Sequence, residues 1–291
     1  MKPSILVTGA KGLVGSKFIE MFSDEYNFEI LDISDEQNPV DITNHTQVCS
    51  ALENSDAKYI VHYAAYTDVT GAWKQNGDQT GAAYKVNVDG TRNVIQACQK
   101  TNKHLIHIST AYVFNGEKEG LYTEEDQLTP IEWYGHTKAE AERIITESDI
   151  KWTILRIDQP FRSDTQVRPD VARRIAQGLK DNNLYPQFNN HYFGPTYIDD
   201  FARVVDFMIR TNTVGLFNAS SGEKWTDYDF ANLVKSILKL DGDVKAGDLN
   251  KYLMTLDRPY QRNTAMDATK LKQVLDFQLK TVEEALKEVV I

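Results

Sequence analysis

A glycine-rich turn near the start of the chain places the strongest constraint on how it can fold. The turn follows an apolar run, carries Gly9, Gly12 and Gly15, and leads into residues with helical periodicity. Without a Cβ, the backbone at Gly9 and Gly12 can approach a pyrophosphate, and the free N–H groups of the next helix point at the anion. We therefore interpret residues 5–22 as a strand, a phosphate-binding turn and a helix.

An acidic residue in the second strand distinguishes this turn from a plain break between a strand and a helix. The apolar run 28–31 ends in Asp32, where a carboxylate can accept hydrogen bonds from an adenosine ribose. A carboxylate there also repels a 2′-phosphate, although Lys11 in the turn can offset part of that repulsion. The sequence therefore predicts NAD or NADP as the cofactor and favours NAD.

Composition narrows the class of protein. The 42 acidic and 32 basic side chains give a formal net charge of −10, and no long basic block offers a footprint for nucleic acid. Two cysteines at no metal or redox spacing are typical of a reducing compartment. No apolar run is long enough to cross a membrane, and the amino terminus does not resemble a secretory signal. We expect a cytoplasmic protein that binds neither nucleic acid nor a membrane.

Strands and helices alternate through the first half of the chain. Apolar strands are expected at 58–65, 104–108 and 152–155, helices at 47–52, at 82–100 and from 134, and a loop at 71–81. This order predicts an α/β fold with a doubly wound parallel Rossmann sheet in residues 1–156. Residues 157–291, with helical patterns at 171–179, 201–209, 230–240 and 282–290, are expected to form a smaller mixed α/β substrate lobe, and parts of them can return to the main sheet.

Three side chains carry the chemistry that we expect. Tyr134 and Lys138 share one face of a helix, where an ammonium would lower the pKa of the phenol from about 10 toward neutrality. Thr110, at the end of the fourth strand, supplies a hydroxyl for a carbonyl oxygen. The Tyr-x-x-x-Lys spacing alone is equally consistent with a solvated lysine that lies beside an aromatic ring and has no catalytic role. With the glycine turn, the set predicts carbonyl reduction or its reverse, with hydride from nicotinamide C4 and Tyr134 as the proton donor.

Short motifs occur along nearly the whole chain. They are TGAKGLVG at 8–15, DIT at 41–43, AA at 64–65, VN at 86–87, ISTAYVFNG at 108–116, YGHTK at 134–138, GPTYIDD at 194–200, RP at 258–259 and MDATKL at 266–271. These segments resemble the successive motifs of the extended short-chain dehydrogenase/reductases, and most closely those of the dTDP-4-dehydrorhamnose reductase group. The resemblance implies a nucleotide-linked 4-keto-6-deoxy sugar as the substrate.

The resemblance also assigns roles to residues. It implies a catalytic set of Thr110, Tyr134 and Lys138, with Asn87 in support. The residues placed around the cofactor are Gly9, Lys11, Gly12, Leu13, Val14, Asp32, Asp41, Ile42, Ala64, Ala65, Tyr66, Tyr134 and Lys138. From the residues alone, Asp41 is as well explained by a role in beginning a turn. Many relatives form dimers, so a homodimer is an option by analogy.

Arginines and aromatic residues are candidates for the substrate's nucleotide end. Tyr112, Arg162 and Arg258 are the substrate residues that we expect, because a guanidinium matches phosphate oxygens; Arg168 and Arg262 are weaker candidates, and solvent-exposed charge is the alternative for all four arginines. His136 and Glu140 share a helix face but lack a third ligand, so no metal is assigned.

Two departures from the reductase pattern leave other functions open. Ala111 stands where reductases often have Asp, and residues 156–162 lack the usual Thr-Ser-Trp-Val-Tyr run. Ala111 and Tyr112 also differ from the Asp-Glu pair of 4,6-dehydratases, and Ala111 from the cysteine of fucose-forming epimerase-reductases. A nucleotide-sugar epimerase, or a non-catalytic NAD(P)-binding subunit similar to the regulatory chain of methionine adenosyltransferase, therefore remains as an alternative to the reductase.

Overall fold

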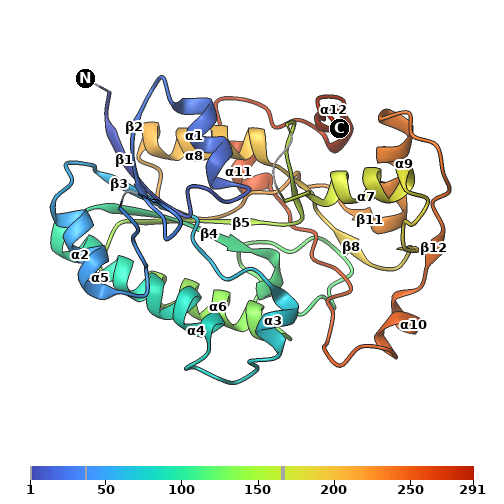
Figure 1. The fold of residues 1–291 in the computed structure, drawn as a ribbon, viewed down its shortest axis with the longest axis horizontal. Helices are drawn as coiled ribbons and strands as arrows, with labels where there is room; N and C mark the ends of the chain where they lie inside the picture. Colours follow the sequence, from blue (N-terminus) through green and yellow to red (C-terminus); the bar gives the residue numbers. More distant parts are fainter. Residues whose placement is uncertain (1, 37, 165–167) are drawn as a thin grey trace.

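A six-stranded parallel sheet lies at the centre of the computed structural model, which describes residues 2–36, 38–164 and 168–291 (Figure 1). Its strands are β1 Ser4–Thr8, β2 Asn27–Leu31, β3 Tyr59–His62, β4 His104–Thr110, β5 Trp152–Ile157 and β10 Gly215–Asn218. They are ordered β10-β5-β4-β3-β1-β2, and every neighbouring pair is parallel. The α/β doubly wound fold predicted from the sequence is confirmed.

Helices cover both faces of this sheet because its strands are apolar on both sides. One layer holds α1 Gly15–Phe22, α8 Ile198–Thr211 and α11 Thr269–Val274; the other holds α2 His45–Glu53, α5 Thr91–Thr101 and α6 Trp133–Thr146 (Figure 1). Alternate residues of one strand serve the two layers: Ile5 and Val7 join the α1 and α8 core, whereas Leu6 joins the α2 and α5 core. This alternation fixes which side chains of each strand face helix α6.

The connection between β3 and α5 differs from the prediction. The expected loop at 71–81 begins with helix α3 (Val69–Trp73), because Asp68 caps it by accepting from the Gly71 N–H at 2.9 Å. The expected helix at 82–100 is helical but not uniform: α4 (Ala82–Tyr84) runs into a π-helical segment (Lys85–Gly90) before α5. Such π-helical turns often occur at functional sites, and this one contains Asn87.

Short elements form the lobe on one side of the sheet. In chain order they are β6 Pro160–Phe161, α7 Val171–Lys180, β7 Gln187–Phe188, β8 Tyr192–Phe193, β9 Thr196–Tyr197, β11 Trp225–Thr226, α9 Asp227–Ile237, β12 Ala246–Gly247, α10 Leu249–Leu253 and α12 Val282–Leu286. The 3-10 turn η2 Ala111–Val113 lies instead at the end of β4 and packs against α6. Two helices are displaced from their predicted ranges of 230–240 and 282–290. Thr226 caps α9 earlier, and beyond α12 the Val290 N–H leaves the helix to bond the Ser163 carbonyl.

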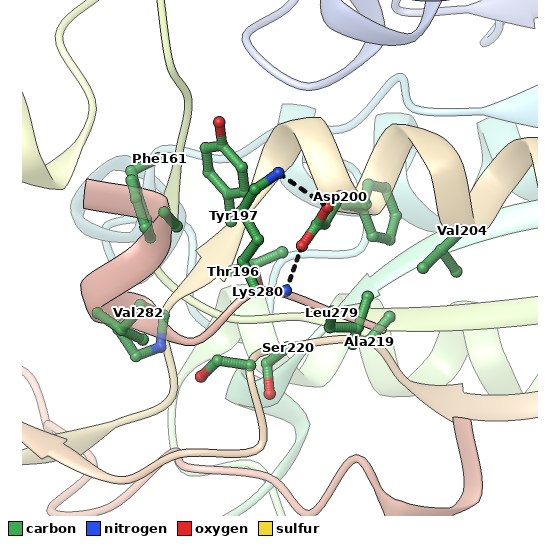
Figure 2. Close-up of a pocket in the computed structure, with 14 residues that line it drawn as sticks. Phe161, Thr196, Tyr197, Asp200, Val204, Ala219, Ser220, Leu279, Lys280 and Val282 are labelled. Carbon is green, nitrogen blue, oxygen red and sulfur yellow. Dashed lines mark hydrogen bonds and ion pairs between the residues drawn. The ribbon is translucent and has the colours of Figure 1, made fainter. Parts of the chain in front are cut away.

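The second half of the chain contributes to the sheet as well as to the lobe. Strand β10 pairs with β5, and α8 packs against α1, so both belong to the half of the molecule that holds the six-stranded sheet. A cavity of about 20 Å³ lies where this half meets the lobe, between Phe161, Tyr197 and Ala219 (Figure 2). It has room for about one water molecule, so it is not a ligand site.

Candidate active site

The glycine turn connects β1 to α1 and is held by close backbone contacts. Gly9 has a φ of +63°, and a Cβ there would lie 2.6 Å from the Ala64 nitrogen. A Cβ on Gly15 would lie 2.7 Å from the Gly9 carbonyl oxygen. The Gly12 N–H donates to that same oxygen at 3.1 Å. Glycine at positions 9 and 15 is therefore required by the fold of the turn itself, before any ligand binds.

Asp32 lies at the end of β2, beside this turn. Its carboxylate accepts hydrogen bonds from the Ser34 N–H (2.9 Å), the Ser34 hydroxyl (2.7 Å) and the Lys11 N–H (3.2 Å). Burial opposes ionisation, but these hydrogen bonds outweigh it and lower the pKa of Asp32. The Lys11 ammonium donates to the Ser34 carbonyl at 2.7 Å. Asp32 is thus a fixed negative charge at the turn.

Asp41 and Ile42 take mainly structural positions. The Asp41 carboxylate accepts from both the N–H and the hydroxyl of Thr43 at 2.8 Å, which is the turn-forming role weighed for it. Ile42 is buried in the α2 and α5 core, and its side chain fills the space beside Gly90. These two contacts of Ile42, with the core and with Gly90, keep its side chain away from the surface.

Asn87 links the segment after β3 to helix α6. Its side-chain oxygen accepts from the Tyr66 N–H at 2.8 Å, and its amide donates to the Tyr66 carbonyl at 3.1 Å and to the Thr137 hydroxyl at 2.8 Å. Thr137 in turn donates to the Tyr134 carbonyl. Ala64 and Ala65 lie in the segment held this way, and the Ala64 N–H donates to the Thr8 hydroxyl. The side chain of Asn87 is 1% exposed, so its role is to position neighbouring groups.

The structure brings Thr110 and Tyr134 together. Thr110 is the last residue of β4, and Tyr134 lies in the first turn of α6. Burial raises the pKa of the Tyr134 phenol, and the nearby Thr110 hydroxyl offsets this only in part. Tyr134 therefore holds its proton at neutral pH.

Lys138 does not act on the phenol as expected. Its ammonium donates to the Ile108 carbonyl at 2.8 Å and lies 3.0 Å from His107 Nε2. Burial lowers the pKa of Lys138 to about 8, against an opposing effect of the Glu142 carboxylate. The expected lowering of the Tyr134 pKa by Lys138 is wrong for this structure. The ammonium is held instead by two acceptors on β4, the Ile108 carbonyl and the His107 imidazole.

Sequence reasoning missed four buried groups around this set: His107, Glu132, Glu142 and Asp158. Glu132 caps α6 by accepting from the Tyr134 and Gly135 N–H groups at 2.8 and 2.7 Å, and burial raises its pKa to about 7. Its place just before the helix was the available signal. For His107, the signal was strand alternation, which points it toward α6.

Two of the three expected substrate residues lie beside Tyr134 or its neighbours. The Tyr112 ring meets the Tyr134 ring edge-on, with centroids 5.8 Å apart. The Arg258 guanidinium lies 4.9 Å from the centroid of Tyr260, and its charge lowers the pKa of the Glu132 carboxyl, against the larger effect of burial. Arg258 is half-buried and therefore accessible.

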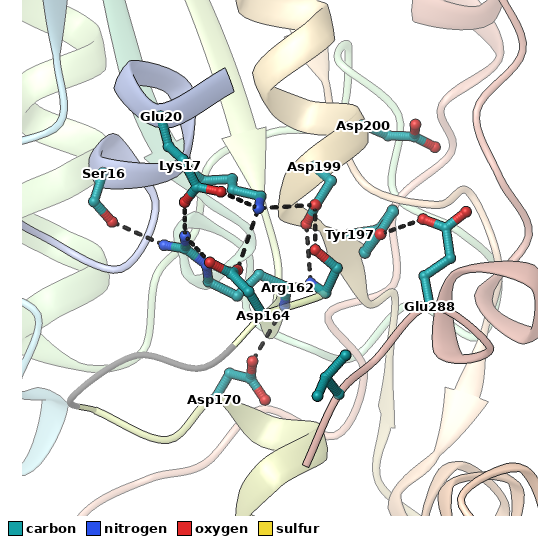
Figure 3. A network of polar contacts seen from close by, with 12 residues as sticks. Ser16, Lys17, Glu20, Arg162, Asp164, Asp170, Tyr197, Asp199, Asp200 and Glu288 are labelled. Carbon is teal, nitrogen blue, oxygen red and sulfur yellow. Dashed lines mark hydrogen bonds and ion pairs between the residues drawn. The ribbon is translucent and has the colours of Figure 1, made fainter. Parts of the chain in front are cut away.

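Arg162 is fully buried and is used for structure. Its guanidinium donates to the Leu13 carbonyl, Ser16, Glu20 and Asp164, and thereby ties the end of the glycine turn to the segment after β5 (Figure 3). All three of its guanidinium nitrogens are engaged, so it presents no free pair of N–H groups to a pyrophosphate.

The remaining candidate residues lie at the surface. Arg168 and Arg262 are exposed. His136, also exposed, lies 6.1 Å from Trp133 between ring centroids. No three metal-ligating side chains gather within the described ranges.

Comparison with known proteins identifies the family. The family model described as the RmlD substrate binding domain matches residues 1–291. The chain belongs to the RmlD substrate-binding-domain family. A dTDP-4-dehydrorhamnose reductase from Aggregatibacter actinomycetemcomitans is 30% identical over 98% of this chain and 97% of the relative. Methionine adenosyltransferase 2 subunit beta from Pongo abelii is 25% identical over 92% of this chain and 81% of the relative.

Solved structures agree with this membership of the RmlD family. The dTDP-4-dehydrorhamnose reductase from Bacillus anthracis str. Ames, in complex with NADP, superposes with a TM-score of 0.89 at 25% identity, over 99% of this chain and 98% of the other. The resemblance to extended short-chain dehydrogenase/reductases drawn from the motifs is therefore confirmed. None of the described helices of this RmlD-family chain has the length and apolar character needed to cross a bilayer.

Proposed function

We propose that this chain is an NAD(P)-dependent oxidoreductase that reduces the carbonyl of a nucleotide-linked 4-keto-6-deoxy sugar. The observation that carries the proposal is the placement of Thr110, at the carboxyl end of β4, and Tyr134, in the first turn of α6, near enough for the Thr110 hydroxyl to lower the pKa of the phenol. In open parallel sheets this edge is where ligands bind. Relatives named as dTDP-4-dehydrorhamnose reductases support the choice of substrate class.

The turn after β1 fits a dinucleotide. The backbone is left-handed at Gly9, and neither Gly9 nor Gly12 carries a Cβ that would keep a pyrophosphate away from the turn before α1. When bound, the dinucleotide supplies the hydride. Lys138 is the residue that would hydrogen-bond the nicotinamide ribose.

Tyr134 is suited to donate a proton to the carbonyl oxygen. Its raised pKa keeps the phenol protonated at neutral pH, which is the form that a reduction consumes. Thr110 orients the phenol and offers a second donor to the same oxygen. The Glu132 cap and the Asn87 and Thr137 contacts hold the first turn of α6, so the phenol is fixed before substrate arrives.

We propose that NAD is preferred over NADP. The Asp32 carboxylate has a lowered pKa, and its negative charge at the end of β2 opposes a 2′-phosphate. The Lys11 ammonium is engaged by the Ser34 carbonyl, so it neutralises that charge only partly. At the other end, Arg258 is the residue proposed for the substrate's pyrophosphate, beside Tyr112.

The test is the loss of reduced nicotinamide absorbance when NADH and NADPH are offered with a panel of nucleotide-linked 4-keto sugars. Turnover with at least one sugar, and a higher kcat/KM for NADH, is expected. Tyr185→Phe is a matched control for later tyrosine variants, since Tyr185 is 84% exposed and lies outside the site. No turnover with any sugar of the panel would refute the reductase proposal.

Two other functions would give different results with the same purified protein. An epimerase would co-purify with tightly bound dinucleotide and consume none of it. A binding subunit, favoured by the similarity to methionine adenosyltransferase 2 subunit beta, would show no reductase activity and would capture an enzyme partner in stoichiometric amount.

The proposal also covers location and assembly. We place the enzyme in the cytoplasm, where Cys49 and Cys98, both buried and free, stay reduced.

We further propose a homodimer. Tyr84, Trp133 and His136 line a groove of about 260 Å³ on the outer side of α4 and α6, where a second copy could pack. Sedimentation at several concentrations tests this, and a monomer at all of them would contradict it.

A further inference from the structure

Asp158 is a buried carboxylate that the proposed reaction does not yet use. It follows directly on β5, whose last residue, Ile157, pairs in register with Thr110. Asp158 therefore lies at the same edge of the sheet as Thr110, one strand over. It is 2% exposed.

The structure holds Asp158 rigidly by its backbone and by one side-chain oxygen. The Asp158 N–H donates to the Thr196 hydroxyl at 3.0 Å. The Thr196 N–H donates to the Asp158 carbonyl at 2.9 Å. Its Oδ2 accepts from the Gly194 N–H at 3.0 Å and from the Thr264 hydroxyl at 2.7 Å. These contacts come from two lobe segments, so the lobe fixes the direction of the carboxylate.

The other oxygen of the same carboxylate has no partner. Asp158 Oδ1 is buried and makes no hydrogen bond within the described part of the chain. The neighbouring Gln159 N–H acts on the carboxylate only by lowering its pKa, against the larger effect of burial. A buried acceptor left unpaired carries a free-energy cost, so such an atom signals a missing partner.

The charge of Asp158 acts on two tyrosines of the site. Asp158 contributes to the raised pKa values of both Tyr134 and Tyr112, after burial as the largest cause. Burial raises the pKa of Asp158 itself to about 6, with its hydrogen bonds opposing the rise. Asp158 is therefore mostly ionised at neutral pH and available as an acceptor.

We propose that Asp158 determines substrate specificity by accepting a hydrogen bond, through Oδ1, from the sugar hydroxyl next to the carbonyl that Tyr134 protonates. This inference rests on the proposed reductase function. In a 4-keto-6-deoxy hexose, C3 carries a hydroxyl, whereas the neighbour on the other side, C5, carries only a methyl group and the ring oxygen. Only the C3 side can donate to a carboxylate.

The test compares two substrates, a nucleotide-linked 4-keto-6-deoxy sugar and its analogue that lacks the C3 hydroxyl. A hydrogen bond to a charged acceptor in a buried site is typically worth a factor of about 10 to 100 in kcat/KM. The natural chain should prefer the hydroxylated sugar by that factor. Asp158→Ala should bring the preference to about one, mainly by raising KM for the hydroxylated sugar.

Asp158→Asn keeps the volume of the side chain and changes one atom. Because Gly194 and Thr264 both donate to Oδ2, the asparagine oxygen must stay there, and its NH2 group takes the place of Oδ1. The acceptor becomes a donor, so this variant should lose most of the preference while keeping its melting temperature near that of the natural chain. Asp206→Asn, a buried carboxylate on α8 that binds Tyr26 and Arg210, is the control and should retain the preference.

The outcomes separate this inference from the reductase proposal. No turnover by the natural chain on either sugar refutes both. Turnover by the natural chain with an unchanged preference in Asp158→Ala and Asp158→Asn overturns the role of Asp158 alone. An equal loss of rate on both sugars would show that Asp158 only supports the fold of the site, which also overturns the inference.

Discussion

The ion pair between Glu142 and Arg156 provides a sharp test of how the catalytic helix is held. Arg156, on β5, donates Nε and Nη2 hydrogen bonds of 2.9 and 2.6 Å to Glu142, on α6. The two side chains are 2% and 3% exposed. Glu142 also accepts from Ser109 at 2.5 Å, and the guanidinium lies 5.1 Å from the centroid of the Phe114 ring. The carboxylate therefore joins α6 to both β4 and β5.

Glu142→Gln leaves the Arg156 charge buried without a counter-charge. Breaking one side of such a buried pair typically costs about 3–5 kcal/mol, whereas replacing both partners with apolar residues of similar volume costs much less. We expect Glu142→Gln to lower the free energy of unfolding by about 3 kcal/mol, and the double variant Glu142→Leu, Arg156→Met to lie closer to the natural chain than either single variant. Urea unfolding followed by circular dichroism, with an unchanged m-value, measures the difference.

A matched control lies one turn further along the same helix. Glu147 pairs with Arg143 at the surface, with side chains 60% and 53% exposed, and Glu147→Gln should leave the unfolding midpoint unchanged within error. The reasoning is refuted if Glu142→Gln is as stable as this control, or if the double variant loses the sum of the two single losses.

Three further predictions follow from the site. The kcat/KM for the keto sugar should fall as the pH rises through about 8, because Lys138 loses its proton there. Glu142→Gln should move this fall to lower pH, since the Glu142 carboxylate raises the pKa of Lys138. A flat profile up to pH 10 would contradict a role for the Lys138 ammonium. Asp32→Ser should raise the kcat/KM for NADPH relative to NADH about 10-fold by removing a negative charge, and an unchanged ratio would exclude Asp32 as the selector. Gly9→Ala should lower the melting temperature of the cofactor-free protein, since its Cβ would meet the Ala64 backbone at 2.6 Å; equal melting temperatures would contradict the packing of the turn.

Five of the six strands of the sheet were predictable because each is encoded locally. Apolar runs such as 104–108 and 152–155 reappear as β4 and β5, and the glycine turn joins β1 to α1 as expected. Strand β10 was not predicted as a strand, because its four residues, Gly215–Asn218, carry too short an apolar run to stand out from a loop. Its place in the sheet depends on pairing with β5, which lies some sixty residues earlier in the chain.

The site was predictable in its reacting residues and less so in their surroundings. Motif spacing named Thr110, Tyr134 and Lys138, but the direction in which the Lys138 ammonium points depends on the Ile108 carbonyl and His107, which only the folded sheet brings near. Arg162 illustrates the reverse case. Its residue type suggested phosphate binding, whereas the carboxylates of Glu20 and Asp164, from α1 and the segment after β5, engage it instead.

The measurement closest to the central claim compares Tyr134→Phe with the natural chain in one assay, using NADH and a nucleotide-linked 4-keto sugar. Removing a general acid costs about 10²–10⁴-fold in rate, so we predict a loss of kcat in that range while the dissociation constant for NADH, from fluorescence titration, stays unchanged. Turnover by Tyr134→Phe at the rate of the Tyr185→Phe control would contradict the assignment of Tyr134 as the proton donor.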